Sequence, residues 1–436
     1  MTERIETECI ELTIEKAVYG GDGLAHHPVT GKAIFVPLVL PGERIQAALQ
    51  EEKRNFARAE ATRILSSFPQ RIDPLCPYFS RCGGCQYQHT QYEAQLGMKR
   101  EILRETLNRS AVAMSRTIDT IAGEPWAYRN RVRFAFTAEG QLAYRSRSSH
   151  MLISVESCPI AAPILVSTAL ALAEWSLAHP APVPLREVEL FCDQDATSLL
   201  ITLFVERATD KQTAQAWLTM LHAALPAEVR GMRMELDNSN LETQAIAASG
   251  ELSLAYSVAG IPYRVDSGAF FQVNRLLLDR FVERVTGYLP KAKLAWDLYA
   301  GVGLFARQLA ARCDRVHAVE IAPASREALQ QNLAGTTAVP FFSATLDYLR
   351  GNRERRETRP DWIILDPPRA GLGPEVTQLL NAIHAPEMVY VSCDPATLAR
   401  DLKALIAERY RIADVTLVDI FPQTFHIETV VHLTRA

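Results

Sequence analysis

The stretch DLYAGVGLFA, residues 297 to 306, joins the end of an apolar, strand-like run to the start of a helix-like run. Two glycines, Gly301 and Gly303, lie in the turn, where the lack of a side chain lets a ligand approach the backbone closely. The same alternation of apolar strand and amphipathic helix continues from about residue 290 onward. It predicts a doubly wound parallel sheet of the Rossmann-like α/β class, which binds ligands at the carboxyl ends of its strands.

Acidic residues end the first two of these strands, Asp297 in DLYAG and Glu320 in RVHAVEI. An acid at the end of the second strand can accept hydrogen bonds from ribose hydroxyls. A dinucleotide site would prefer GxGxxG, whereas residue 306 is alanine, and an aspartate before the turn suits a cationic nucleoside without phosphates. The pattern favours a site for S-adenosylmethionine, while a glycine turn that only packs the helix is the alternative.

Two more features belong to this part of the chain. Asp366 follows a strand in ILDPPRAGL, where two prolines form a rigid lip that can hold a planar base beside a methyl donor. The final strand-like runs, in IADVTLVDIFPQTFHIETVVHLTR, have no helix between them. They predict an antiparallel hairpin at the edge of the sheet.

The rest of the chain divides into two further predicted domains. Residues 1–66 alternate apolar and polar residues around a glycine-rich turn and predict a small β-barrel, which binds RNA or serves as a structural cap. Residues 67–258 begin with prolines and clustered cysteines, continue with a helix from about residue 91 to 108, and predict a central α+β domain. Residues 259–436 then form the sheet domain described above.

Composition narrows the class of protein. With 436 residues, 48% of them hydrophobic and 22% charged, the chain is an ordinary globular one, and its net charge of −4 argues against a protein that coats nucleic acid. The N-terminus lacks the apolar segment of a secretory signal, and the apolar run 161–173 is too short to span a bilayer. We therefore expect a cytoplasmic protein without a membrane segment, and no obligate protein partner is indicated.

One segment is locally basic. Residues 129 to 147 contain five arginines and a single acid, interleaved with aromatic residues. This mixture suits phosphate contact combined with base stacking, and an exposed strand pair with solvated charges explains it equally well. The candidate RNA contacts are Arg129, Arg131, Arg133 and Arg145.

A cysteine follows the strand-like run in VSCDPATLARD, residues 391 to 401. Cys393 would lie at the ligand edge of the sheet and beside a helix N-terminus, whose dipole is expected to lower the pKa of the thiol. Taken alone, a buried and inert cysteine at a strand end is the commoner case.

Three more cysteines cluster in CPYFSRCGGCQYQH, at positions 76, 82 and 85, and Cys158 follows far downstream in VESCP. In a cytoplasmic chain such clusters indicate a metal or catalysis more often than disulfides. Four thiolates fit a tetrahedral zinc ion or a 4Fe–4S cluster, and the spacing alone does not separate the two.

Together, DPPR, SCDPATLARD and DIFPQTFHIE, with GAFFQVN at 268 to 274, closely resemble the RNA uridine carbon-5 methyltransferases over essentially the whole chain. The resemblance implies Cys393 as nucleophile, Glu428 as base and S-adenosylmethionine as donor. It also implies a TRAM-like barrel and a 4Fe–4S cluster on the four cysteines, a combination most similar to the 23S rRNA branch of the family. The donor positions that it implies, with the acids and glycines above, are Gln272, Tyr299, Glu320, Asp366, Asp297, Gly301 and Gly303.

Two departures from the family's pattern concern the donor site. Leu304 follows the second glycine, where a polar residue is common, and SAT replaces an acid or amide after the third strand, with Asp347 as the nearest substitute. The alternatives are the same chemistry on a tRNA uridine and a non-catalytic RNA-binding iron–sulfur protein. A radical methylthiotransferase would need C-x3-C-x2-C, and a cytosine carbon-5 methyltransferase a second cysteine near the Asp-Pro-Pro strand; neither is present.

Overall fold

The computed structural model describes residues 9–112, 117–147, 149–236, 244–355 and 359–436. Contacts divide the chain into two compact units. The first contains Met1–Glu105, Arg145–Met151 and Phe421–His426, and the second contains Thr106–Tyr144, Leu152–Ile420 and Ile427–Ala436. The second unit holds both the central segment and the C-terminal sheet, so the three expected domain boundaries remain a prediction.

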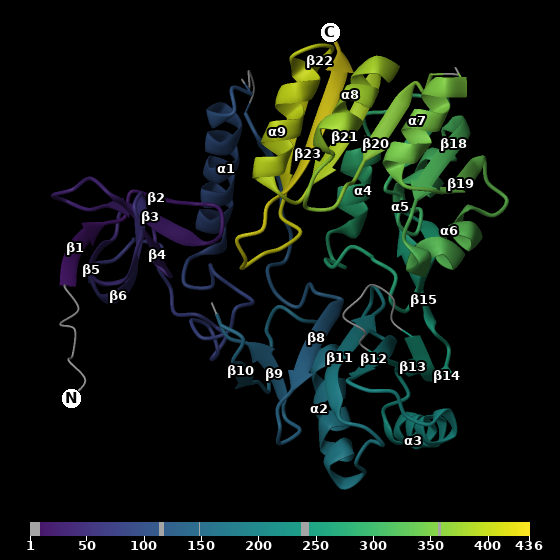
Figure 1. Ribbon diagram of the computed structural model, residues 1–436, viewed down its shortest axis with the longest axis horizontal. Helices are drawn as coiled ribbons and strands as arrows, with labels where there is room; N and C mark the ends of the chain where they lie inside the picture. Colours follow the sequence, from purple (N-terminus) through teal and green to yellow (C-terminus); the bar gives the residue numbers. More distant parts are fainter. Residues whose placement is uncertain (1–8, 113–116, 148, 237–243, 356–358) are drawn as a thin grey trace. The chain divides into compact units, whose positions relative to one another are not determined.

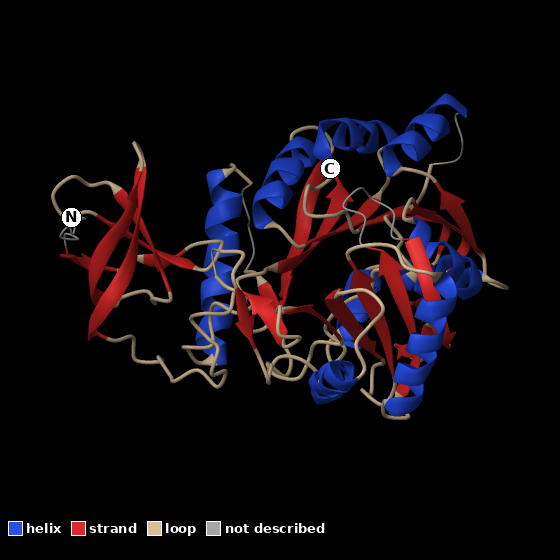
Figure 2. Ribbon diagram, turned by 60° about the horizontal axis from the view of Figure 1, so that its bottom comes forward, coloured by secondary structure: helices blue, strands red, loops and turns tan. Residues whose placement is uncertain are grey.

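The first unit begins with a small, strongly bent six-stranded sheet (Figure 2). Its first strand alternates exposed and buried residues, as expected when one face of a sheet packs on a core. The core residues include Ile10, Leu12 and Ile34. The strands are β1 (Cys9–Thr13), β2 (Lys16–Ala17), β3 (Asp22–His26), β4 (Ala33–Pro37), β5 (Arg44–Glu52) and β6 (Phe56–Ser66), in the order β1-β5-β6-β4-β3-β2. The helix expected after the cysteine cluster is α1 (Tyr92–Arg109), which confirms that prediction.

The central segment of the second unit forms a seven-stranded sheet covered by two helices. Strand β12 is buried along its whole length, because it lies inside the sheet and is apolar throughout. The strands are β8 (Arg131–Phe136), β9 (Leu142–Arg145), β10 (Leu152–Ser154), β11 (Leu185–Cys192), β12 (Leu199–Val205), β13 (Val229–Leu236) and β14 (Gln244–Gly250). The helices are α2 (Pro163–Ala178) and α3 (Lys211–Ala224), and a separate hairpin follows, β15 (Ser253–Val258) with β16 (Ile261–Asp266).

The C-terminal part of the second unit is an eight-stranded sheet in the order β19-β18-β17-β20-β21-β23-β22-β7. Five parallel strands run from the edge strand β19 to β21, as the alternating pattern predicted. They are β17 (Ala292–Leu298), β18 (Cys313–Glu320), β19 (Ala338–Phe342), β20 (Trp362–Leu365) and β21 (Glu387–Ser392). The strand order changes direction between β17 and β20, where sheets of this kind bind their ligands.

The C-terminal hairpin is present but does not form the edge of the sheet. Strands β22 (Tyr410–Val418) and β23 (Glu428–Arg435) pair antiparallel, and β23 inserts between β21 and β22. The outermost strand is β7 (Asp119–Ile121), which pairs parallel with β22. The prediction of an edge hairpin was wrong on this point, because a three-residue strand from the preceding segment gives no periodicity of its own.

Helices form a layer on each side of this sheet (Figure 1). One layer contains α7 (Thr345–Arg355), α8 (Gly373–Ile383) and α9 (Pro395–Ile406), of which α8 packs against both of its neighbours. The other contains α4 (Leu278–Thr286), α5 (Leu304–Leu309) and α6 (Arg326–Leu333), the last preceded by the 3-10 turn η1 (Pro323–Ser325). The two layers leave the strand ends as the place where backbone and polar side chains can reach a ligand.

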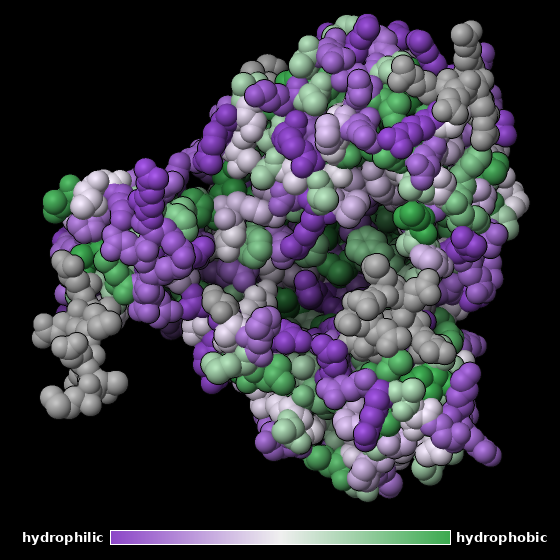
Figure 3. Space-filling model, viewed as in Figure 1, coloured by the Kyte–Doolittle hydropathy of each residue, from purple (hydrophilic) through white to green (hydrophobic). Residues whose placement is uncertain are grey.

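The described residues contain no helix that is both long and apolar enough to cross a membrane. On the face of the molecule shown in Figure 3, hydrophilic side chains cover most of the helices around the eight-stranded sheet. Most apolar residues of the sheet's central strands are instead buried, among them the whole of β20.

Candidate active site

The glycine turn after β17 combines two glycines with different tasks. Gly303 has a φ of +87°, and a Cβ at this position would lie 2.9 Å from the Leu329 side chain of α6. Gly301 has a φ of +55°, and a Cβ there would meet no atom within 4 Å. Gly303 is therefore required for helix packing, whereas the backbone at Gly301 borders open space that a ligand can occupy.

Two acids stabilise this turn by accepting hydrogen bonds from its backbone N–H groups. Asp297 is fully buried, and its Oδ2 accepts a hydrogen bond of 2.7 Å from the backbone N–H of Ala306 in α5. Glu320 accepts from the backbone N–H groups of Gly301 (2.7 Å) and Ala322 (2.6 Å). Each oxygen of Glu320 keeps a second lone pair for a ribose hydroxyl. Burial, opposed by the Ala306 bond and reinforced by nearby acids, raises the pKa of Asp297 to about 8.

Tyr299 lies between the strand and the glycines in an unusual conformation. Its φ is +68°, in the left-handed region that non-glycine residues rarely adopt. Such strain persists where surrounding structure enforces it, and it is concentrated at functional sites. The sequence identified Tyr299 only through the family resemblance, because no local pattern announces a positive φ for a tyrosine.

Asp366 begins the lip, residues 366–372, directly after β20. The side-chain amide of Gln272 is 3.4 Å from Asp366 Oδ2, which brings the GAFFQVN segment to the end of the sheet. Burial raises the pKa of Asp366 to about 7. Asn130, which no sequence pattern marked as a site residue, supports Gln272. It is fully buried, and its side-chain amide donates to the backbone carbonyl oxygen of Gln272 at 3.0 Å. The asparagine in YRNRVRF was read only as part of a basic segment.

Cys393 and Glu428 are brought together by strand register. Ser392 of β21 pairs with Thr429 of β23 in an antiparallel ladder, so the next position along places Cys393 opposite Glu428. Asp366 follows the last residue of β20, which is the parallel neighbour of β21 on the other side. The thiol thus lies opposite the carboxyl group of Glu428, and Asp366, which is level with Val391 in this register, also acts on it electrostatically.

The expectation of a lowered pKa for Cys393 was wrong. Burial, the charge of Glu428 and the charge of Asp366 raise the pKa of the thiol to about 12, against an opposing effect of Arg369. The helix end that was expected to stabilise a thiolate is already occupied. Asp394 caps α9 by accepting from the backbone N–H groups of Ala396 (3.0 Å) and Thr397 (2.9 Å).

Glu428 shares this environment. Burial, together with the charge of Asp366, raises the pKa of Glu428 well above its usual range, while Arg369 acts in the opposite direction. A carboxyl group of raised pKa is suited to accept a proton near neutral pH, as a general base must. In the sequence Arg369 is only one letter of the DPPR motif, yet in the structure its positive charge acts on both Cys393 and Glu428.

The four predicted RNA contacts lie in different surroundings. Arg131 pairs with Glu189 and lies over the ring of Phe191, and Arg133 pairs with Glu187. Arg129 interacts electrostatically with the Cys158 thiol. Arg145 is exposed, and its carbonyl oxygen accepts from the backbone of Gly83. Their role in RNA binding remains a prediction.

The cysteine loop lies in the first unit, and Cys158 lies in the second. Cys76, Cys82, Cys85 and Cys158 are all partly exposed, and none of them forms a disulfide among the residues that the structure describes. The backbone N–H of Gly84 donates to the Cys82 sulfur at 3.4 Å. Among the residues that the structure describes, no three Cys, His, Asp or Glu side chains are arranged to hold a metal ion.

Asp347, the substitute acid after the third strand, is exposed in the first turn of α7. The residues after β19 instead contact the neighbouring strand through their backbone, since the N–H of Ser343 donates to the carbonyl of Glu320 at 3.2 Å.

A comparison with solved structures finds one of the same fold. A tRNA (uracil-54, C5)-methyltransferase of Pyrococcus abyssi, in complex with S-adenosyl-L-homocysteine, superposes with a TM-score of 0.75. The similarity covers 98% of this chain and all of the other, at 23% sequence identity. It shows that the two proteins share a fold.

Sequence comparison defines the family. The 23S rRNA (uracil(1939)-C(5))-methyltransferase RlmD of Chromohalobacter salexigens is 31% identical over 100% of this chain and 91% of its own length. RlmD of Pectobacterium atrosepticum is 32% identical, over 94% and 90%. A model of the family described as tRNA (Uracil-5-)-methyltransferase matches residues 91–341 and 353–436. The chain therefore belongs to the tRNA (uracil-5-)-methyltransferase family and is an S-adenosylmethionine-dependent RNA (uracil-C5)-methyltransferase.

Proposed function

We propose that the protein methylates carbon 5 of a uridine in 23S rRNA through a covalent bond between Cys393 and carbon 6 of the base. The observation that carries the proposal is the register of β21 and β23, which sets Cys393 opposite Glu428 beside Asp366. The rRNA target is supported by two relatives that are 31% and 32% identical and are named 23S rRNA methyltransferases. A tRNA uridine is the second candidate, because the structural neighbour is a tRNA enzyme.

Covalent addition overcomes the poor nucleophilicity of carbon 5. The Cys393 thiol loses its proton to solvent and its sulfur bonds to carbon 6, which leaves an enolate that is nucleophilic at carbon 5. Since the pKa of the thiol is about 12 in the free protein, the thiolate forms only in small amounts before RNA binds. The positive charge of Arg369 favours it.

Methyl transfer and release follow at the same place. Carbon 5 attacks the methyl group of S-adenosylmethionine, and S-adenosylhomocysteine leaves. Glu428 then takes the proton from carbon 5, the carbon 5–carbon 6 double bond forms again, and the sulfur of Cys393 is expelled as thiolate. The raised pKa of Glu428 matches this task, because a base that accepts a proton from carbon needs a basic carboxylate.

The donor would lie across the neighbouring strands. In this proposal Glu320 accepts from the ribose hydroxyls, Gly301 leaves room for the nucleoside, Gln272 borders the space beside Asp366, and Tyr299 contributes from the turn after β17. Asp297 would act indirectly, because its hydrogen bond with Ala306 fixes the start of α5. We assign Gly303 to helix packing within this donor site.

We further propose that Cys76, Cys82, Cys85 and Cys158 hold a 4Fe–4S cluster, with zinc as the alternative ligand. Four partly exposed thiols outside any described disulfide, and an N–H donor to the Cys82 sulfur, fit either group chemically. Such a group would supply structural cross-linking, because the uracil chemistry needs no electron transfer. The six-stranded sheet, which we compare to a TRAM domain, and the arginines of residues 129 to 147 are the proposed RNA contacts.

Transfer of labelled methyl groups to defined RNAs tests the function. Purified protein is incubated with methyl-labelled S-adenosylmethionine and either 23S rRNA or bulk tRNA, and the nucleosides are separated by mass spectrometry. We expect 5-methyluridine in 23S rRNA, and none with Cys393→Ala. Methylation of tRNA alone would select the second candidate, and unchanged activity of Cys393→Ala would disprove the covalent route.

A further inference from the structure

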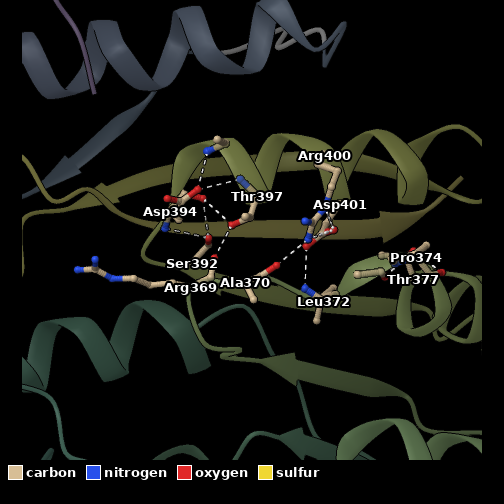
Figure 4. A network of polar contacts seen from close by, with 12 residues as sticks. Arg369, Ala370, Leu372, Pro374, Thr377, Ser392, Asp394, Thr397, Arg400 and Asp401 are labelled. Carbon is tan, nitrogen blue, oxygen red and sulfur yellow. Dashed lines mark hydrogen bonds and ion pairs between the residues drawn. The ribbon is translucent and has the colours of Figure 1, made fainter. Parts of the chain in front are cut away.

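Helix α9 begins two residues after Cys393 and also contacts the lip, residues 366–372. Three of its side chains bind backbone groups of the lip (Figure 4). The Thr397 hydroxyl donates to the carbonyl of Arg369 at 3.1 Å, and Arg400 donates to the carbonyl of Ala370 at 2.8 Å. The N–H of Leu372 donates to Asp401 Oδ2 at 2.8 Å. We call Thr397, Arg400 and Asp401 the clamp.

The spacing of the clamp is that of one helix face. Positions i, i+3 and i+4 lie above one another on an α-helix, so the three side chains meet the same stretch of neighbouring backbone. The lip follows β20, and α9 follows β21, which is the parallel neighbour of β20. The clamp therefore fastens the lip to the element that directly follows the predicted nucleophile.

Asp401 is the centre of the clamp. Its side chain is 2% exposed, and besides Leu372 it accepts from the Tyr390 hydroxyl at 2.9 Å and from Arg400 Nε at 2.9 Å. A carboxylate this deeply buried is tolerated only when its oxygens are hydrogen-bonded. Its partners come from the lip, from β21 and from α9 itself, so Asp401 joins all three.

Gly371 makes this close approach possible. A Cβ at this position would lie 2.4 Å from Asp401 Oδ2 and 2.7 Å from Arg400 Nη2. Its φ of +73° is also unfavourable for other residues. The backbone of the lip consequently lies directly on the clamp, with no side chain between them.

Arg369 is fixed by this arrangement at its own carbonyl group. The prolines before it fix the φ angles of the chain that leads to it, Thr397 binds its oxygen, and its side chain extends away from the clamp in Figure 4. We propose that Asp401, Thr397 and Arg400 are positioning residues. They hold the Arg369 guanidinium where its positive charge acts on Cys393 and Glu428. The proposal rests on the proposed role of Cys393 as nucleophile, and it assigns to α9 the placement of both the thiol and the cation that acts on it.

A double-mutant cycle separates positioning from general destabilisation, because residues that act through one another give non-additive effects. The measured quantity is the rate of covalent adduct formation with 23S rRNA that contains 5-fluorouridine, as a function of pH. Asp401→Asn keeps the size of the side chain but removes its charge and places an N–H₂ group toward donors. We expect a decrease of about 10- to 100-fold in adduct rate, the size of effect that a misplacement near 1 Å produces. The pH at which the rate is half-maximal should rise.

The same substitution in an Arg369→Gln background should cause almost no further loss, because the cation that Asp401 positions is gone. Asn381→Ala is the matched control: Asn381 donates to the carbonyl of Ala404 in α9 at 3.1 Å, away from the lip. It should lower the melting temperature and leave the adduct rate unchanged. If Asp401→Asn does not fold, Thr397→Val replaces it, with a smaller loss that should also vanish in the Arg369→Gln background.

Either of two results would overturn the proposal. One is an unchanged adduct rate and pH profile in folded Asp401→Asn, and the other is a loss that multiplies fully with that of Arg369→Gln. The nucleophile is checked separately with Cys393→Ala. Adduct formation by that variant refutes the proposed function itself, whereas its failure to form an adduct, combined with normal Asp401→Asn, refutes the clamp alone.

Discussion

Cys393 should behave as a protonated, poorly reactive thiol in the free enzyme. With a pKa of about 12, about 1 thiol in 10,000 is ionised at pH 8, against about 1 in 4 for an ordinary cysteine with a pKa of about 8.5. The more basic thiolate is intrinsically more nucleophilic, by about 25- to 55-fold over this pKa difference. The two effects together predict alkylation about 40- to 100-fold slower than that of a small reference thiol.

Iodoacetamide labelling followed by mass spectrometry of the Cys393 peptide measures this rate between pH 7 and pH 10.5. The rate should rise about tenfold per pH unit throughout, because the group stays far below its pKa. The reference thiol should level off above about pH 9.5. A plateau for Cys393 below pH 9 would show that the thiolate already exists in the free enzyme, and would refute the reasoning from burial and neighbouring carboxyl groups.

Three other perturbations have defined outcomes. Glu428→Gln should lower turnover by about 100- to 10,000-fold through loss of the base, while the methylated adduct accumulates on a denaturing gel; unchanged turnover would exclude Glu428. Affinity for S-adenosylmethionine should rise from pH 6 to about pH 8 and then level off, because the cationic donor favours the ionised forms of Asp366 (pKa about 7) and Asp297 (pKa about 8). Titration calorimetry in two buffers should then detect proton release, and a pH-independent affinity would contradict it. Cys82→Ala should abolish iron content and visible absorbance in anaerobically purified protein, whereas zinc in the unaltered protein would select the alternative metal.

Much of the C-terminal sheet was predictable because its strands are buried on both faces. A continuous apolar run such as that of β20, ended by Asp366 and two prolines, has few other interpretations. The hairpin could also be predicted from the sequence, since its two strands are joined without a helix. Strand β7 escaped prediction because three residues, Asp119–Ile121, are too few to show a period.

The electrostatics of the site could not be predicted from the sequence. The motifs predict Cys393 and Glu428 as the reacting pair, which remains a prediction, but the pKa of the thiol depends on which groups surround it in space. The sequence shows Cys393 beside a helix N-terminus, whereas the structure shows that Asp394 already binds the N–H groups there. Burial and two carboxyl groups from other strands then determine the direction of the shift.

The clamp could not be predicted from the sequence either. Thr397, Arg400 and Asp401 have the spacing of any helix face, and only the tertiary structure shows that they meet the backbone of the lip. In the sequence Gly371 is only part of the stretch ILDPPRAGL, and nothing there marks it as required. Its necessity follows from the distance of 2.4 Å between a Cβ at that position and Asp401.

The most direct test of the account is to identify the bond between enzyme and RNA. The protein is incubated with S-adenosylmethionine and 5-fluorouridine-substituted 23S rRNA, digested with protease and nuclease, and its peptides are sequenced by mass spectrometry. We expect a nucleotide that carries both fluorine and the transferred methyl group, attached through the sulfur of Cys393. Methylation without any adduct, or an adduct on another residue, would contradict it.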